Sequence, residues 1–101
     1  LAKRGRTAGL GAAAMAQAMR AYKELNLRAL RILRLGGLLA TCSCSGRVSV
    51  DDFSTMLRGA AQDAGRPLQL LWRRGAGIDH PVLWGLPESE YLKCWLFRVL
   101  A

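Results

Sequence analysis

Long apolar runs are missing from this sequence of 101 residues. Its longest uncharged stretches, residues 7–19 and 35–46, are short and rich in glycine, alanine and serine. A membrane-spanning helix needs roughly 18–20 consecutive apolar residues, so we expect no transmembrane span. A phosphate-binding loop is missing as well, because Gly75-Ala76-Gly77 does not lead into the Lys-Ser/Thr pair that opens the helix of such a loop.

Residues that carry chemistry are also scarce. The chain has one histidine and three cysteines, and this odd cysteine count without a regular spacing predicts reduced thiols in an intracellular protein. Cys42, Cys44, Cys94 and His80 would suffice for a zinc site, but the Cys-x-Cys spacing is tighter than zinc sites use. Buried free thiols are the simpler interpretation. Since no spacing supports a nucleophile with its base, we predict no metal, no cofactor and no enzymatic activity.

Acidic residues are outnumbered, with 7 Asp and Glu against 15 Lys and Arg and a net charge of +8. Residues 1–34 hold eight of the basic residues and only Glu24 as an acid. The sequence therefore predicts an anion-binding surface in its N-terminal third, facing RNA, anionic lipid headgroups or an acidic protein. The predicted contacts are Lys3, Arg4, Arg6, Arg20, Lys23, Arg28, Arg31 and Arg34. A packed helix with a solvated basic face is the alternative.

Apolar residues recur at helical spacings of three and four over most of the chain. Residues 1–11, with three glycines, predict a flexible basic arm. Asp51 and Asp52 are suited to opening a helix. The predicted helices are 12–35, Asp52–Ala64, Leu68–Arg74 and Pro87–Leu100, with 41–46 as a loop. We therefore predict an all-α fold of four to five helices, in which the arm precedes a single domain over residues 12–101.

Most aromatic residues lie in the C-terminal half, away from the basic third. The helix predicted over Pro87–Leu100 is apolar almost all round, which implies burial on more than one side. We interpret the aromatic side chains of this half as anchors in a protein interface. The predicted interface residues are Trp72, Trp84, Tyr91, Trp95 and Phe97.

Residues 41–52 resemble the loop of an EF-hand. With Gly46 at the sixth position, side-chain oxygens fall at positions 1, 3, 5, 9 and 12, as calcium ligands do. These residues are Thr41, Ser43, Ser45, Ser49 and Asp52. A second loop of this kind runs from Asp79 to Glu90. Because hydroxyls replace most of the carboxylates, the resemblance implies a degenerate calmodulin-like pair that grips a target helix without calcium.

Two stretches resemble the small matrix-side subunit of the mitochondrial cytochrome bc complex. They are Ala-Tyr-Lys-Glu-Leu-Asn-Leu-Arg at 21–28 and Leu-Pro-Glu-Ser-Glu-Tyr at 86–91, which leads to Phe97-Arg98. Tyr22-Lys23 in a basic helix is also similar to the Leu-Tyr-Arg family of mitochondrial accessory proteins. Both resemblances imply a small basic accessory subunit.

These features together predict a non-catalytic structural subunit of a large multiprotein complex of the mitochondrial respiratory chain. Its apolar C-terminal helix would bind neighbouring protein subunits, and its basic helix would bind an anionic surface. Two alternatives stay open. One is an EF-hand-like light chain or regulatory module of the cytoplasm or cytoskeleton, and the other is a protein bound to ribosomal RNA.

Overall fold

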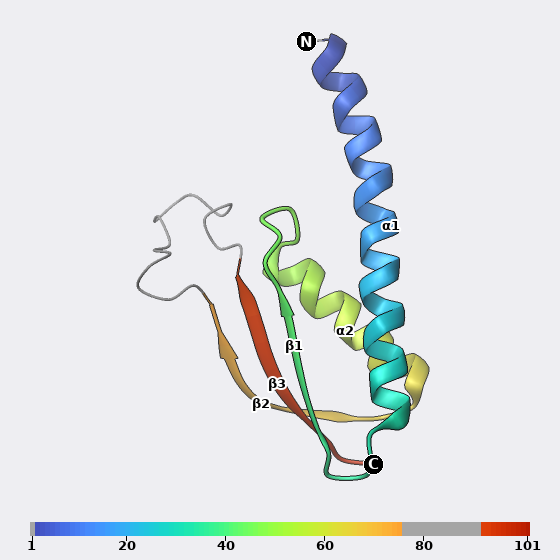
Figure 1. Cartoon of the computed structure of the whole chain (residues 1–101), viewed down its shortest axis with the longest axis vertical. Coiled ribbons are helices and arrows are strands. Elements are labelled where there is room, and N and C mark those ends of the chain that lie inside the picture. The colour runs from blue at the N-terminus through green and yellow to red at the C-terminus, as the bar shows by residue number, and fades with distance from the viewer. Residues whose placement is uncertain (1, 76–91) are drawn as a thin grey trace.

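The computed structural model describes residues 2–75 and 92–101 (Figure 1). Their elements are α1 (Ala2–Ile32), β1 (Leu38–Ser43), α2 (Val50–Ala64), β2 (Leu68–Arg74) and β3 (Lys93–Val99). The N-terminal half of α1 projects past the sheet and α2 (Figure 1). Among the described helices, none combines the length and the apolar character that crossing a bilayer requires.

Local sequence signals define both ends of α2. Ser49 is its N-cap, and the Ser49 hydroxyl accepts a hydrogen bond of 3.0 Å from the backbone N–H of Asp52. Asp51 and Asp52 lie in the first turn, where the helix dipole favours negative charge. Gly65 ends the helix in the left-handed conformation, at φ 66°. The predicted acid-opened helix that ends before Gly65 is therefore confirmed.

The three strands form one sheet in the order β1-β3-β2, with β3 antiparallel to both neighbours. β1 and β2 are consequently parallel to each other, and α2 is the helical connection between them, as a parallel crossover requires. β3 follows β1 and β2 in the sequence but lies between them in the sheet. This arrangement leaves β1 and β2 as the two edges of the sheet within the described residues.

One face of the sheet is covered by the helices. On β1 the residues alternate strictly between exposed and buried, and Trp95, Phe97 and Val99 of β3 point to the same covered side. Phe53 of α2 is fully buried there, with its ring edge-to-face to Trp95 at a centroid distance of 5.0 Å. The core is therefore built between the strands β1 and β3 and both helices, and α1 contributes Leu27 and Leu30 to it.

Arg66 joins the end of α1 to the turn after α2. Its Nη1 donates hydrogen bonds to the backbone oxygens of Leu30, at 2.6 Å, and Leu33, and its Nε donates to the backbone oxygen of Ala101 at 3.0 Å. The last carbonyls of a helix have no partner within the helix and carry its negative dipole end, so a cation at this place stabilises α1.

The all-α prediction is wrong, because the chain is α/β: its described residues form two helices and a three-stranded antiparallel sheet. Leu68–Arg74, predicted as a helix, is β2, and Lys93–Val99, predicted inside the last helix, is β3. In β3 the burial alternates with the period of two that a strand requires, which the apolar composition concealed. The structure also continues α1 through residues 2–11, which the sequence assigns to an arm.

The EF-hand interpretation is wrong for a related reason. Thr41 and Ser43 are buried residues of β1, and the Ser49 hydroxyl caps α2, so these oxygens do not converge on an ion. An EF-hand also needs a helix before its loop, and a strand occupies that position. The second proposed loop, Asp79–Glu90, lies outside the described residues.

Candidate functional site

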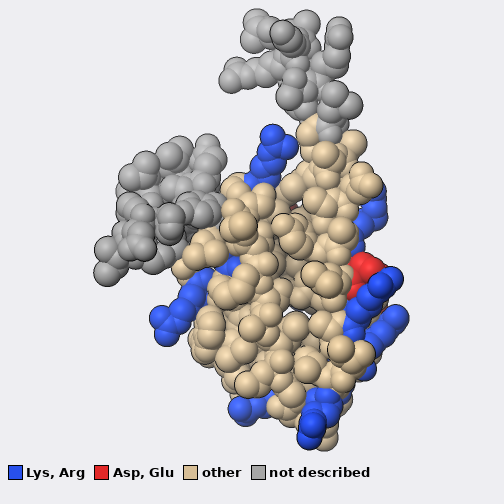
Figure 2. Space-filling view, viewed as in Figure 1, with Lys and Arg blue, Asp and Glu red and all other residues tan. Residues whose placement is uncertain are grey.

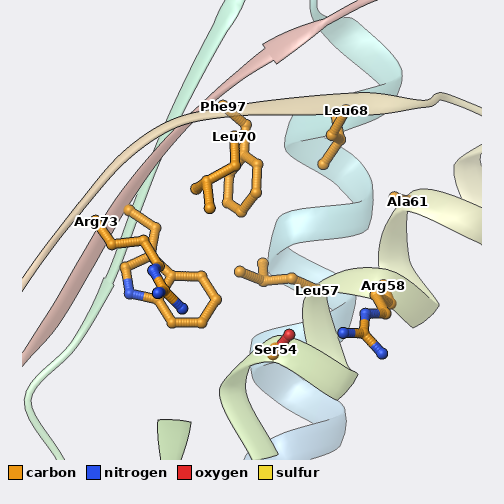
Figure 3. A pocket seen from close by; sticks show the side chains of 9 residues that line it. Ser54, Leu57, Arg58, Ala61, Leu68, Leu70, Arg73 and Phe97 are labelled. Atoms are coloured by element: carbon orange, nitrogen blue, oxygen red, sulfur yellow. The ribbon is translucent and has the colours of Figure 1, made fainter. Parts of the chain in front are cut away.

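A groove opens between α2 and the β2 edge of the sheet, and we call it the α2–β2 groove (Figure 3). Its volume is about 400 Å³, within the range of pockets that hold small ligands. The groove exists because the helices cover β2 incompletely: Leu70 is 45% exposed although it faces the same side as buried Phe97. Its lining residues are Ser54, Leu57, Arg58, Ala61, Leu68, Leu70, Arg73, Trp95 and Phe97.

The charged side chains of the α2–β2 groove are both arginines. Arg58 comes from α2 and Arg73 from β2, on opposite sides of the cavity (Figure 3). The Cζ of Arg73 lies over the Trp95 ring, 5.5 Å from its centroid, a contact that favours a cation on the ring face. Within the described residues neither arginine forms an ion pair, and no acidic residue lines the groove. The groove is therefore a positively charged site with an apolar floor.

A β-bulge directs Arg73 into this groove. Leu70 pairs with Phe97 and Trp72 pairs with Leu96, so Leu71 is an extra residue in β2. Without the bulge, Trp72 would pair with Trp95 and point to the covered face, and Arg73 would pair with Cys94 and point to the uncovered face. Arg58 and Arg73 are not among the site residues predicted from the sequence. The sequence neighbours Trp72 and Arg73-Arg74, an aromatic residue beside two cations, were a signal of a binding site. The alternation of side chains along a strand does not by itself reveal a bulge, however.

The predicted anion contacts of α1 divide into paired and unpaired cations. Lys23 forms an ion pair of 2.8 Å with Asp63 of α2, and Arg28 forms one of 2.9 Å with Glu24. Arg20, Arg31 and Arg34 are exposed and make no ion pair with the described residues. Nothing is described of the side chains of Lys3, Arg4 and Arg6. On the face shown in Figure 2, Lys and Arg lie around the rim of the surface and acidic side chains appear at one place.

The aromatic residues predicted as interface anchors have different positions. Trp95 and Phe97 are 5% and 9% exposed, so their rings already belong to the core of this chain. Trp72 is 40% exposed on the uncovered face, where the Arg74 guanidinium lies over its ring. Trp84 and Tyr91 lie outside the described residues. Trp72 is therefore the described member of this set that is open to another molecule.

The structure pairs two of the three cysteines. Cys42 of β1 and Cys94 of β3 are register partners and form a disulfide, whereas Cys44 is an exposed free thiol. The prediction of three reduced thiols therefore differs from the structure, because the sheet brings together residues that lie 52 positions apart. The disulfide also removes two ligands from the zinc alternative, and its fourth, His80, lies outside the described residues.

Among solved structures, the fold resembles SAM-dependent methyltransferases. A protein that was named as a methyltransferase and crystallised with SAH, and a protein from Streptococcus mutans that was named as a SAM-dependent methyltransferase, each superpose with a TM-score of 0.73 over 80% of this chain, at 21% identity. The match covers 21% of each of those chains. At this identity the comparison establishes the fold, and it confirms that the chain is α/β. No known family model matches the sequence.

Relatives found by sequence are more similar to this chain than these solved structures are. Proteins named ribosomal RNA large subunit methyltransferase I are 43% identical to this chain in Pseudoalteromonas atlantica, over 88 residues, and in Yersinia pestis, over 86 residues. The chain spans 22% of the length of these relatives, and the matches take in 87% and 85% of the chain. The similarity is thus to one segment of a longer protein.

These comparisons correct the functional predictions. The similar proteins are methyltransferases by name, so the prediction of a non-catalytic respiratory-chain subunit is wrong, as are the proposed resemblances to EF-hand proteins and to the cytochrome bc complex. The mitochondrial assignment is wrong as well, because the relatives belong to bacteria, which have no mitochondria. The comparisons give no support to partner subunits of a large protein complex.

Proposed function

We propose that this chain is a segment of an rRNA methyltransferase and forms part of its catalytic domain. The observation that carries the proposal is the identity of 43% to ribosomal RNA large subunit methyltransferase I across 85–87% of the chain. Two further observations support it. The strands and helices superpose on SAM-dependent methyltransferases, and the net charge of +8 suits a polyanionic substrate.

The exposed apolar side chains fit a segment that packs against more protein. Leu25 and Ile32 of α1 are 68% and 86% exposed, and Leu38 of β1 is 49% exposed. β1 is also an edge strand among the described residues, with one row of backbone hydrogen-bonding groups left unpaired. Since the relatives are several times longer, we assign these surfaces to contacts with other segments of the enzyme.

Neither described groove fits the methyl donor. S-Adenosylmethionine carries a sulfonium and an ammonium against one carboxylate, so its net charge is positive. The α2–β2 groove presents two arginines and no acid. A second groove, between α1 and α2, presents Arg20 and Lys23 against Asp52 alone. Cations in both places repel such a ligand, and we assign neither groove to the methyl donor.

Methyl transfer to rRNA tests the proposed function. The intact protein is incubated with S-adenosylmethionine labelled in its methyl group and with rRNA from cells that lack the protein. The expected result is stoichiometric label in large-subunit rRNA. rRNA from cells that contain the protein is the matched control, and it should accept little label because its target is already modified. A folded protein that labels neither rRNA would contradict the proposal.

The exposed cations of α1 provide a second measurement. If they contact the RNA backbone, neutralising Arg20, Arg28 and Arg31 together lowers RNA affinity and flattens its salt dependence, by about 0.9 per lost contact with a duplex. Arg28 is included because its exposed pair with Glu24 is weak. An unchanged salt dependence would remove α1 from the RNA-binding surface while leaving methyl transfer to be judged by its own assay.

A further inference from the structure

The α2–β2 groove has the composition of a nucleotide-binding site. We propose that it holds one unpaired nucleotide of the RNA substrate, with the phosphate backbone at Arg58 and Arg73 and the base over the apolar floor. This inference rests on the proposed function and adds a location and a substrate conformation to it. Methyl-donor chemistry has no part in the proposal, since the groove is positively charged.

The charge of the groove selects an anion. Arg58 and Arg73 approach the cavity from α2 and β2, and no acidic residue lines it (Figure 3). Both arginines are exposed and form no ion pair with the described residues, so their charge is available to a ligand. Arginine binds phosphate oxygens through paired N–H donors. Ser54, on the wall formed by α2, adds a hydroxyl that donates or accepts.

The floor of the groove selects a flat apolar group beside that anion. Leu70 remains 45% exposed next to Phe97, and Leu57 points into the same space from α2 (Figure 3). Arg73 is held over the Trp95 ring at 5.5 Å, and an arginine in such a position offers its guanidinium plane to a base. A volume of about 400 Å³ accommodates one nucleotide and is too small for an RNA duplex.

The same dimensions favour an unpaired nucleotide over a duplex. A base inside a duplex is stacked on both sides, and its edges alone are accessible. To reach Leu70 and Leu57 the base must leave the stack, which a loop, a bulge or a strand end permits at lower cost than a helix does. Single-stranded RNA is therefore the ligand that the groove fits.

Binding of single-stranded RNA to the intact protein tests the inference. Affinity is measured by fluorescence anisotropy across a salt series for the wild type, Arg58→Gln, Arg73→Gln and the double variant. If each arginine contacts a phosphate, the double variant lowers the slope of log affinity against log salt by about 1.4 and the affinity at physiological salt on the order of tenfold. Arg47→Gln is the matched control, since it removes one exposed arginine from the loop before α2 and should leave the affinity unchanged.

Cross-linking identifies where the RNA lies. RNA containing 4-thiouridine is irradiated in the complex, and the cross-linked peptides are mapped. Cross-links to residues 54–61 and 68–74 support the groove. Cross-links confined to α1, a slope that Arg58→Gln and Arg73→Gln leave unchanged, or equal competition by duplex RNA would each overturn it.

The two proposals fail in different ways. If the chain is not part of an rRNA methyltransferase, the wild-type protein transfers no methyl group to rRNA. If the groove does not hold a nucleotide, the wild type methylates rRNA and the Arg58→Gln/Arg73→Gln variant does so with the same dependence on RNA concentration. A raised RNA concentration for half-maximal rate, without a change in the temperature of unfolding, is the result expected for the groove.

Discussion

The two edges of the sheet are covered very differently. Along β1 every second residue is buried beneath the helices, including Leu39, Thr41 and Ser43. Along β2 no residue is buried, and Leu70, which faces the same side, is nearly half exposed. The difference arises because α2 packs Phe53 against Trp95 of β3 and leaves the groove beside β2 open.

This contrast indicates that the β1 side of the sheet contributes mainly to stability and the β2 side mainly to binding. The β1 side consists of fully buried contacts whose loss leaves a cavity. The β2 side carries two arginines and exposed apolar surface whose loss costs the fold little. A substitution at the first side should therefore change the free energy of unfolding, and one at the second should change RNA affinity. Phe53→Ala and Leu70→Gln test this division, and Arg66→Met measures the junction between α1 and the turn after α2.

Phe53→Ala should have the largest effect. Phe53 is fully buried against Trp95, and removal of such a side chain costs about 3–5 kcal/mol. Urea denaturation followed by tryptophan fluorescence measures the change. Thr55→Ala, an exposed position on the same helix, is the control and should change the free energy of unfolding by less than about 0.5 kcal/mol. Similar values for the two variants would show that α2 does not pack as described.

Arg66→Met should have an intermediate effect. It removes the hydrogen bonds to the backbone oxygens of Leu30, Leu33 and Ala101 while keeping the length of the side chain. A hydrogen bond from a charged donor contributes about 1.5–3 kcal/mol, and the partly exposed network should lose about 2 kcal/mol. Arg66→Lys keeps the charge without the planar fork and should recover only part of this loss. Full recovery would assign the effect to charge alone.

Local signals predicted α2 well. A serine cap, two carboxylates in the first turn and a terminal Gly65 are all properties of neighbouring residues, and the structure places them as expected. The apolar spacing of α1 was equally local. These elements could be predicted because helix hydrogen bonds join residues close in sequence.

The strands could not be assigned in the same way. Lys93–Val99 becomes a strand because it pairs with Leu38–Ser43 and Leu68–Arg74, and that pairing depends on residues far apart in the chain. The short apolar run Leu68–Arg74 suits a helix or a strand by periodicity alone. Its bulge, which turns Arg73 toward Arg58, also depends on β3, so the candidate groove was hidden until the sheet was known.

Leu70→Gln should have the smallest effect on stability and still weaken RNA binding. Because Leu70 is 45% exposed, the substitution should cost about 1 kcal/mol of unfolding free energy. It replaces the apolar floor beneath the proposed base, so single-stranded RNA affinity should fall about fivefold. Leu100→Gln, at a similar exposure of 51% but outside the groove, should change stability comparably and leave the affinity unchanged. Equal losses of affinity in both variants would mean that general destabilisation, rather than the groove, weakens RNA binding, and the division between the two edges would not hold.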